Sequence, residues 1–308
     1  MVKNSFRIAA FPIAILIACV IAFSADDKSD IKTAQKTTTF RAGVDVVVLR
    51  AAVTDPLNRY VTGLDKGHFK VFDNKVEQTI SHFSNENSAL SVGIIFDRSG
   101  SMSDKIVSAK NSVVRFLEQG TPRDEYFLVT FNDHVTLAQD FVSKPDDIRN
   151  QIAMLQGKGR TAIYDAIYAG LEKITEAHND KKALIVITDG EDNTSRYTFS
   201  DVKELAKESD AQIYVIGEKG DLGYGRSIIS ELVGLTGGRA FFPDSLKQID
   251  YYCDLIHTEL RNQYVLGFTP SDVTRDGKWH KLKIRLEPPE GLPKLSVRAR
   301  EGYFAPKR

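Results

Sequence analysis

The fold of this chain is decided by the stretch Leu90-Ser91-Val92-Gly93-Ile94-Ile95-Phe96-Asp97-Arg98-Ser99-Gly100-Ser101. Its first seven residues form a mostly apolar run, which is typical of a buried strand. One carboxylate, Asp97, and two hydroxyls, Ser99 and Ser101, follow the run at alternate positions. Oxygen ligands of this kind suit a small divalent cation. The stretch therefore predicts a buried strand with a candidate metal site at its carboxyl end, although Asp, Ser and Gly are also ordinary turn residues.

Two later segments have the same character. Gly159-Arg160-Thr161 precedes a helical pattern over Ala162–Ala177, and Thr188-Asp189-Gly190 follows a second apolar run at 183–187. In an open α/β sheet, ligands bind beyond the carboxyl ends of the strands. We therefore expect the three segments to converge on one site.

Strand-like and helix-like segments alternate over residues 87–260, which predicts an α/β domain with a doubly wound, mostly parallel sheet and helices on both faces. Cys253 falls in the last of these helices, where we expect it to be a small buried apolar residue. The expected strands are 91–96, 126–131, 135–141, 183–188, 212–217 and 239–242, and the expected helices are 104–118, 162–177, 201–208, 226–235 and 246–260.

The order strand-DxSxS, Gly-x-Thr loop, strand-TDG resembles the von Willebrand factor type A (VWA) domain, and the resemblance extends over roughly Leu90 to Leu260. In that family the three loops build a metal-ion-dependent adhesion site. An acidic residue of a bound protein completes the coordination, so the resemblance implies adhesion without catalytic turnover. Carried over by position, it implies the metal ligands Asp97, Ser99, Ser101, Thr161 and Asp189.

The chemistry of these residues agrees with such a site. Asp97 and Asp189 balance the charge of a divalent ion, and the three hydroxyls add neutral oxygens. An octahedral ion then keeps at least one position for an outside ligand. Mg²⁺ is the first choice for a small site made only of oxygen ligands, with Mn²⁺ next and Ca²⁺ as a further alternative.

Each residue also has an ordinary structural interpretation. Ser99 or Ser101 could cap the following helix, and Asp189 could form an Asx turn. Arg98 and Arg160 stand beside the expected ligands. They either point into solvent or lie at the rim of the site, where they would attract and clamp an anionic partner.

The flanks, residues 40–86 and 261–308, contain short strand-like segments. Each flank is too small to bury a sheet face alone, so we expect both to pair into one β-sandwich-like module with the α/β domain inserted between them. Val61-Thr62-Gly63-Leu64 and Glu301-Gly302-Tyr303-Phe304 in these flanks resemble a secreted bacterial subgroup of VWA proteins. The expected strands are 44–53, 69–73, 77–83, 263–268, 278–286 and 295–300.

The N-terminus has the layout of a secretory signal over residues 1–25, with Lys3 and Arg7 before an apolar run at 8–23. Leu16-Ile17-Ala18-Cys19 also resembles a bacterial lipobox, in which Cys19 would carry a lipid. A signal cleaved later and an uncleaved anchor are the alternatives. Residues 26–39 form a polar linker. We expect an exported protein that is periplasmic, on the cell surface or secreted.

Composition excludes several classes of function. With 41 basic and 41 acidic residues among 308, the chain lacks the positive charge of a nucleic-acid binder. Its six histidines show no close paired spacing for zinc, and it contains neither a phosphate-binding GxxxxGK[ST] loop nor a GxSxG elbow. We therefore predict a non-enzymatic, metal-dependent protein-binding protein. The alternatives are an envelope module whose metal only stabilises the fold, and a Mg²⁺-dependent phosphohydrolase with Asp97 as nucleophile.

Overall fold

The computed structural model describes residues 46–85, 87–189, 192–217, 225–244, 248–272 and 276–307. The expected signal segment, the candidate lipidation residue Cys19 and the linker at 26–39 lie outside these residues. Among the described residues, no helix has the length and apolar composition needed to cross a membrane.

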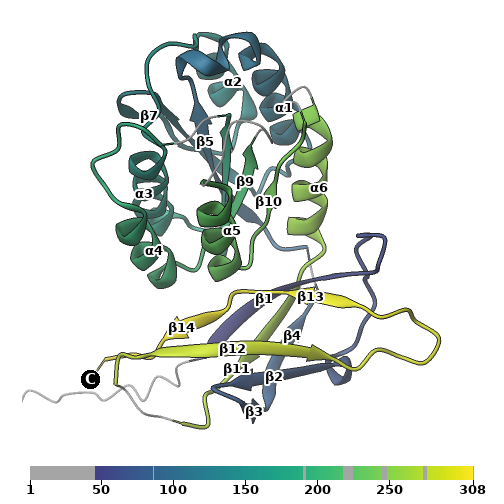
Figure 1. Ribbon diagram of the computed structural model, residues 1–308. Coiled ribbons are helices and arrows are strands. Elements are labelled where there is room, and N and C mark those ends of the chain that lie inside the picture. The colour runs from purple at the N-terminus through teal and green to yellow at the C-terminus, as the bar shows by residue number, and fades with distance from the viewer. Residues whose placement is uncertain are drawn as a thin grey trace, which may run out of the picture. The chain divides into compact units, whose positions relative to one another are not determined.

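A six-stranded sheet forms the centre of the α/β part, in the order β10-β9-β8-β5-β6-β7 (Figure 1). All neighbouring strands are parallel except β7, which pairs with β6 in the antiparallel direction. This confirms the predicted mostly parallel sheet. The strands are β5 (Leu90–Asp97), β6 (Glu125–Phe131), β7 (Val135–Val142), β8 (Lys181–Thr188), β9 (Gln212–Gly217) and β10 (Ala240–Phe241).

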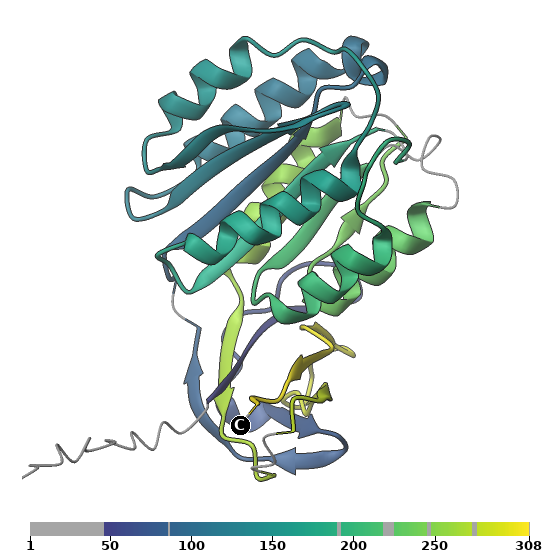
Figure 2. The same ribbon diagram turned by 90° about the vertical axis from the view of Figure 1, so that its left-hand side faces the viewer.

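Helices cover both faces of this sheet (Figure 2). One face packs apolar residues such as Val92 and Ile94 against α1, α2 and α6, and the other packs Ile95 and Val186 against α3, α4 and α5. Alternate residues of a strand point to opposite faces, so an apolar run without interruption is what a sheet covered on both sides requires. The helices are α1 (Ile106–Glu118), α2 (Pro145–Ala153), α3 (Ile163–Lys173), α4 (Phe199–Glu208), α5 (Gly225–Thr236) and α6 (Ile249–Arg261).

Three details of the helices differ from the sequence prediction. The helix expected at 104–118 is preceded by a separate 3₁₀ turn, Gly100–Asp104, and α3 gives way to a second 3₁₀ turn at Ile174–Glu176. Helix α2 was not predicted at all. It begins with Pro145 in the first turn and buries Ile148 and Ile152 on one side. Cys253 is 1% exposed and carries a free thiol, as expected.

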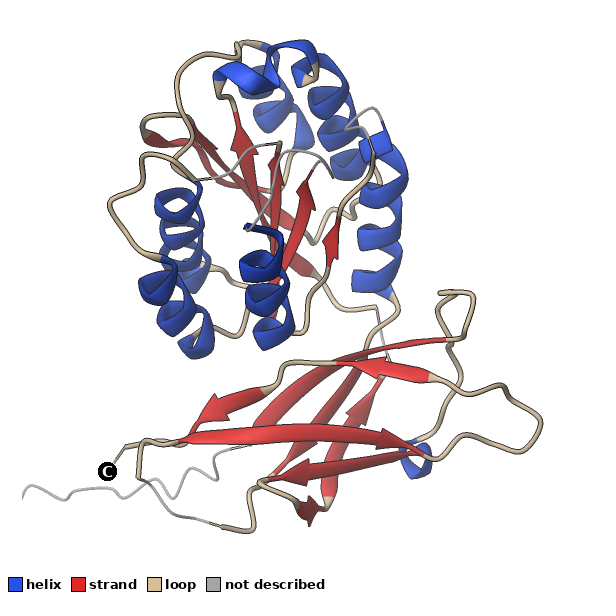
Figure 3. Ribbon diagram, in the orientation of Figure 1, coloured by secondary structure: helices blue, strands red, loops and turns tan. Residues whose placement is uncertain are grey.

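The flanks build two four-stranded sheets, β13-β1-β11-β4 and β14-β12-β2-β3 (Figure 3). Each sheet combines strands from before and after the α/β part, which confirms that the flanks pair with one another. Leu49, Val71 and Leu266 are each fully buried in their shared core. The strands are β1 (Val47–Thr54), β2 (Phe69–Asp73), β3 (Val76–Gln78), β4 (Ile80–Ser84), β11 (Tyr264–Phe268), β12 (Trp279–Leu286), β13 (Ser296–Arg298) and β14 (Gly302–Phe304).

The single strand expected at 77–83 is wrong. The segment forms two strands in different sheets, because Gln78 pairs with Val71 of β2 whereas Ile80 pairs with Phe268 of β11. The 3₁₀ turn Lys66–His68 leads into β2.

A buried carboxylate joins the two parts of the unit Val44–Arg308. Glu259 of α6 is 0% exposed and accepts hydrogen bonds from the hydroxyls of Tyr60 and Tyr214, each at 2.8 Å. Arg298 of β13 pairs with the same carboxylate. Strand β9 and helix α6 are thereby tied to residues from both flanks.

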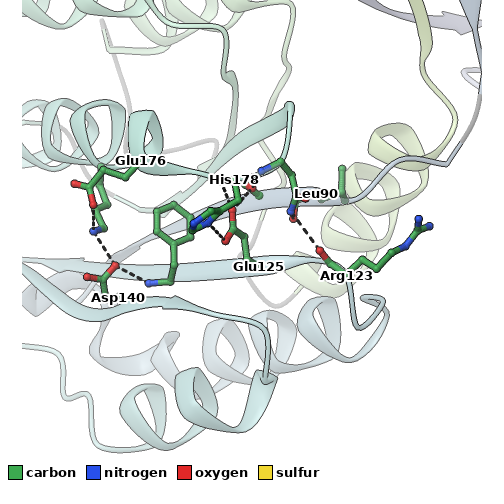
Figure 4. A network of polar contacts seen from close by, with 10 residues as sticks. Leu90, Arg123, Glu125, Asp140, Glu176 and His178 are labelled. Carbon is green, nitrogen blue, oxygen red and sulfur yellow. Dashed lines mark hydrogen bonds and ion pairs between the residues drawn. The ribbon is translucent and has the colours of Figure 1, made fainter.

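Polar contacts also fasten the amino-terminal end of the central sheet (Figure 4). Glu125 accepts a hydrogen bond from the backbone N–H of His178 at 2.6 Å and lies 2.9 Å from the Nδ1 atom of the same residue. Asn179 donates to the carbonyl of Leu90 at 3.0 Å and to that of Arg123 at 3.3 Å. Lys173 joins Asp140 and Glu176 nearby, each at 2.7 Å. This end of the sheet is therefore closed by internal contacts.

Candidate metal site

The three predicted segments meet at the carboxyl end of the central sheet. Strand β5 ends at Asp97, and β8, its parallel neighbour, is followed by Asp189. Both carboxylates are 0% exposed, and Ser99 and Thr161 are nearly as deeply buried. Ser101 is exposed. Adjacent parallel strands bring their carboxyl ends together, so the convergence follows from the topology.

A chain of hydrogen bonds links four of the predicted ligands. Asp97 accepts from the backbone N–H of Ser99 at 2.7 Å through Oδ1, and from the Thr188 hydroxyl at 2.6 Å through Oδ2. The hydroxyls of Ser99 and Ser101 lie 3.0 Å apart, and Ser101 donates to Oδ1 of Asp189 at 2.7 Å. Oxygens of both buried carboxylates thus face one small volume.

Helix capping does not account for the two serines. Ser99 precedes the 3₁₀ turn without a side-chain capping bond, and α1 is preceded by Lys105. The hydroxyls of Ser99 and Ser101 are directed instead to one another and to Asp189. The capping interpretation is therefore wrong for both residues.

The second loop is held against the first by its backbone. Gly100 N–H donates to the carbonyl of Gly159 at 2.9 Å, and Lys158 N–H donates to that of Arg98 at 2.8 Å. Gly159 has a φ of +90°, and a β-carbon there would lie 2.1 Å from a carboxylate oxygen of Asp133. Only glycine fits this position without strain. Its conformation sets the path of the chain into Thr161.

Asn193 holds the second loop against the third, and the sequence prediction missed it. The backbone N–H of Asn193 donates to the carbonyl of Thr161 at 3.0 Å, and its side-chain oxygen accepts from the Thr161 N–H at 3.0 Å. Arg160 donates to the Asn193 carbonyl at 2.8 Å. Among the described residues, no side-chain hydrogen bond joins Thr161 to the other four predicted ligands. Thr161 is positioned by its backbone, and the only sequence signal for Asn193 is the polar run after Asp189.

Asp165 fastens the same loop from the side of α3. It accepts hydrogen bonds from the backbone N–H groups of Arg196 and Tyr197 at 2.8 and 2.9 Å. Asp165 therefore fixes the chain that follows the third segment against the start of α3. Asp192 accepts from the hydroxyl of Ser195. Glu191 lies outside the described residues.

The surroundings of Asp97 disfavour its ionised form. Burial raises the pKa of the Asp97 carboxyl to about 6, against the hydrogen bonds from Thr188 and Ser99, which lower it. Repulsion from Asp189 adds to the rise. The ammonium group of Lys105 lies 2.8 Å from Oδ2 of Asp189 and is a second feature that sequence reasoning missed. Arg98 is half-buried and Arg160 is exposed.

The donor set fits a small, hard cation. The acceptor groups that converge here are carboxylate and hydroxyl oxygens, and among the described residues no group of three or more His, Cys, Asp or Glu side chains could hold a metal ion. Two carboxylates with neutral oxygens match the preference of Mg²⁺ and Mn²⁺, whereas zinc and copper favour nitrogen and sulfur. A divalent ion would also relieve the repulsion between Asp97 and Asp189.

A doubly wound sheet with this loop constellation at its carboxyl end defines a class of ligand-binding α/β domains. A family model of the von Willebrand factor type A domain matches residues 91–249, more than half of the chain. The chain belongs to this family. A comparison with curated protein sequences gave no match.

The chain is similar to several solved structures at low sequence identity. A von Willebrand factor type A protein from Catenulispora acidiphila has a TM-score of 0.50 and 12% identity, covering 85% of this chain and 75% of its own. BatB from Bacteroides thetaiotaomicron has a TM-score of 0.47 and 19% identity, and the alignment covers 56% of this chain and 98% of BatB. A mutant PilB minor pilin from Streptococcus sanguinis has a TM-score of 0.49 and 15% identity, covering 58% and 63%. The aligned region thus spans less than two thirds of the pilin.

Proposed function

We propose that this chain is a non-enzymatic protein-binding protein that holds a divalent cation and uses it to bind an acidic residue of a partner. The observation that carries the proposal is the hydrogen-bond chain that joins the buried carboxylates of Asp97 and Asp189 through Ser99 and Ser101. Membership of the VWA family supports it. The proposed ligands are Asp97, Ser99, Ser101, Thr161 and Asp189, and the proposed ion is Mg²⁺, with Mn²⁺ or Ca²⁺ as alternatives.

The chemistry of binding follows from the charges. A bound ion would attract a carboxylate of the partner, since Ser and Thr hydroxyls add no negative charge of their own. Ser101 is the exposed member of the set and lies at the open side of the site. Arg160 is an exposed residue of the second loop, where it donates to the carbonyl of Asn193 in the third. We propose that Arg160 attracts the acidic partner, with Arg98 as a second candidate.

The phosphohydrolase alternative is less well supported. A nucleophilic Asp97 needs a carboxylate oxygen that can reach a phosphorus atom. Both of its oxygens accept hydrogen bonds within the protein, and the residue is 0% exposed.

We further propose that the protein is exported, in a periplasmic, cell-surface or secreted location. The proposal rests on the sequence of residues 1–25, with Cys19 as a candidate lipid attachment site. The proposed domain organisation is a signal at 1–25, a linker at 26–39, a β-rich flank at 40–86, the VWA domain at 87–260 and a second β-rich flank at 261–308.

Isothermal titration of the metal-stripped protein with Mg²⁺ and Mn²⁺ tests the site. We expect one ion to bind saturably, and Asp97→Ala to abolish binding. The matched control is Asp146→Ala, since Asp146 is an exposed carboxylate on α2 and lies in none of the three site loops. Equal ion binding by the Asp97→Ala protein would contradict the proposed site.

A second measurement tests the use of the ion. Proteins captured on the immobilised chain should be released by EDTA and absent from an Asp97→Ala column. Capture that persists in EDTA would favour the alternative of an envelope module whose metal only stabilises the fold.

A further inference from the structure

Lys105 contacts Asp189 at the candidate metal site but is not one of the predicted ligands. It is the residue between the 3₁₀ turn Gly100–Asp104 and α1, so its position is fixed by the same loop that carries Ser99 and Ser101. Its backbone N–H donates to the carbonyl of Met102 at 2.9 Å. Its side chain is 22% exposed, whereas that of Asp189, its partner, is 0% exposed.

The two oxygens of Asp189 have different partners. Oδ1 accepts from the Ser101 hydroxyl at 2.7 Å, on the side where the predicted ligands gather. Oδ2 accepts from the Lys105 ammonium at 2.8 Å. The lysine therefore leaves the oxygen that faces the other ligands in place, while it contributes a full positive charge directly behind it.

The Lys105 ammonium makes the net charge of the site less negative. Asp97 and Asp189 alone carry two negative charges, and an ion pair between a lysine and a buried carboxylate offsets part of that charge in a low-dielectric environment. Without such a contact, two buried carboxylates would face one another with only neutral donors around them. Leaving a buried charge without compensation destabilises a fold strongly.

We propose that Lys105 is a built-in counter-charge of the metal site, which keeps the metal-free domain folded and weakens its hold on the cation. The inference rests on the proposed function, since it concerns the same ion. An ion bound next to Lys105 remains short of negative charge, and this favours the carboxylate of a partner as an additional ligand. Lys105 is thus a positioning residue for Asp189 and sets the affinity of the site.

Metal titration of variants tests the inference. Lys105→Met removes the charge and should raise the affinity for Mg²⁺ and Mn²⁺ about tenfold, the effect of one unit charge at short range in a partly solvated site. Lys105→Arg keeps the charge and should bind the ions within about twofold of the wild type. Lys110→Met is the matched control, since Lys110 lies on α1 and donates to the carbonyls of Ala153 and Leu155 instead of to Asp189.

Thermal unfolding in EDTA gives a readout that needs no metal. Lys105→Met should lower the midpoint by about 3–8 °C, because Asp189 stays buried without its cation. Added Mg²⁺ should then raise the midpoint more in this variant than in the wild type. An unchanged midpoint in EDTA would overturn the compensating role.

The outcomes separate this inference from the proposed function. If the wild type binds the ion and Lys105→Met binds it equally or more weakly, the counter-charge is refuted while the metal site stands. If only Lys105→Met binds the ion, the lysine alone keeps it out, and the inference is supported in its strongest form. If neither protein binds it, both the proposed function and the inference fail.

Discussion

Both ends of the central sheet bury carboxylates, but their pKa values shift in opposite directions. At the carboxyl end, burial and the neighbouring Asp189 raise the pKa of Asp97. At the amino end, burial alone would raise the pKa of Asp124, yet Arg261 and the N–H groups of Thr121 and Leu90 bring it below its ordinary value. Hydrogen bonds from Ser91 and His178 lower the pKa of Glu125 in the same way. The carboxylates at the amino end are compensated by groups of the protein, whereas Asp97 at the carboxyl end is compensated only in part.

The comparison separates structural from functional burial. A neighbouring cation or several N–H donors stabilise the ionised form of a buried carboxylate. A few donors beside a like charge do not offset the cost of its burial. Strongly perturbed ionisable groups of the second kind are more frequent at functional sites. The same fold can therefore be stabilised at one end while it retains an unfavourable charge at the other.

The largest effect should come from breaking the satisfied end. Asp124→Ala leaves Arg261 without its carboxylate partner and the N–H groups of Leu90 and Thr121 without the acceptor that they reach at 2.8 and 2.6 Å. We expect the free energy of unfolding to fall by about 3–5 kcal/mol, measured by urea denaturation. Asp146→Ala, at an exposed ion pair, should cost less than about 0.5 kcal/mol. A loss of similar size in both variants would contradict the distinction.

At the carboxyl end of the sheet, removal of a buried charge should increase the stability of the metal-free protein. Asp97→Asn removes a buried negative charge but keeps a side chain of the same shape. In metal-free protein at pH 8 we expect the free energy of unfolding to rise by about 1–3 kcal/mol, since the raised pKa reflects an ionised form that the fold disfavours. A clear loss of stability on urea denaturation in EDTA would show that the ionised carboxylate is already compensated.

The pH dependence sharpens this contrast. The pKa of Asp97 lies near 6 in the folded protein against 3.8 ordinarily, so its stabilising contribution is complete below about pH 4 and is lost as the pH rises through about 6. The advantage of Asp97→Asn in metal-free protein should vanish near pH 4 and grow between pH 5 and 7. Asp124 has a lowered pKa, so its contribution is present above the ordinary value and is lost as the pH falls. Thermal midpoints from pH 4 to 8 in EDTA measure both trends, and parallel profiles for the two variants would refute the contrast.

The smallest effect should come from His178. Its side chain is 83% exposed, and its backbone N–H to Glu125 survives substitution. We expect His178→Ala to cost about 0.5 kcal/mol or less on urea denaturation. A cost above about 2 kcal/mol would mean that the imidazole and not the backbone holds this end of the sheet.

The fold was largely predictable from the sequence where burial is complete. The runs that became β5, β8 and β9 are mostly apolar and do not alternate with polar residues, which is typical of a sheet covered on both faces. Helix α2 escaped prediction because it buries only Ile148 and Ile152 over a short length, too few for a clear helical period.

The split between β3 and β4 shows a different limit. Residues 77–83 keep a strand-like composition throughout, and the change of partner between Gln78 and Ile80 is set by β2 and β11, which are distant in sequence. Likewise, Asp97 and Asp189 follow from motifs next to buried strands. Lys105 and Asn193 reach the site through contacts that exist only after folding, and the only local signal for Asn193 is the polar run after Asp189.

The pairing of β4 with β11 has a mechanical consequence. The chain leaves for the α/β part at the end of β4 and returns at the start of β11, and Ser84 and Val265 are partners in register. A pull on a ligand held at the far end of the α/β part would therefore reach both strands at the same end and in the same direction. The two strands would share the load side by side, and the bonds between them would not be the ones sheared. The neighbouring strand β1, paired with β11 over Val47–Ala51, would carry the resisting force instead.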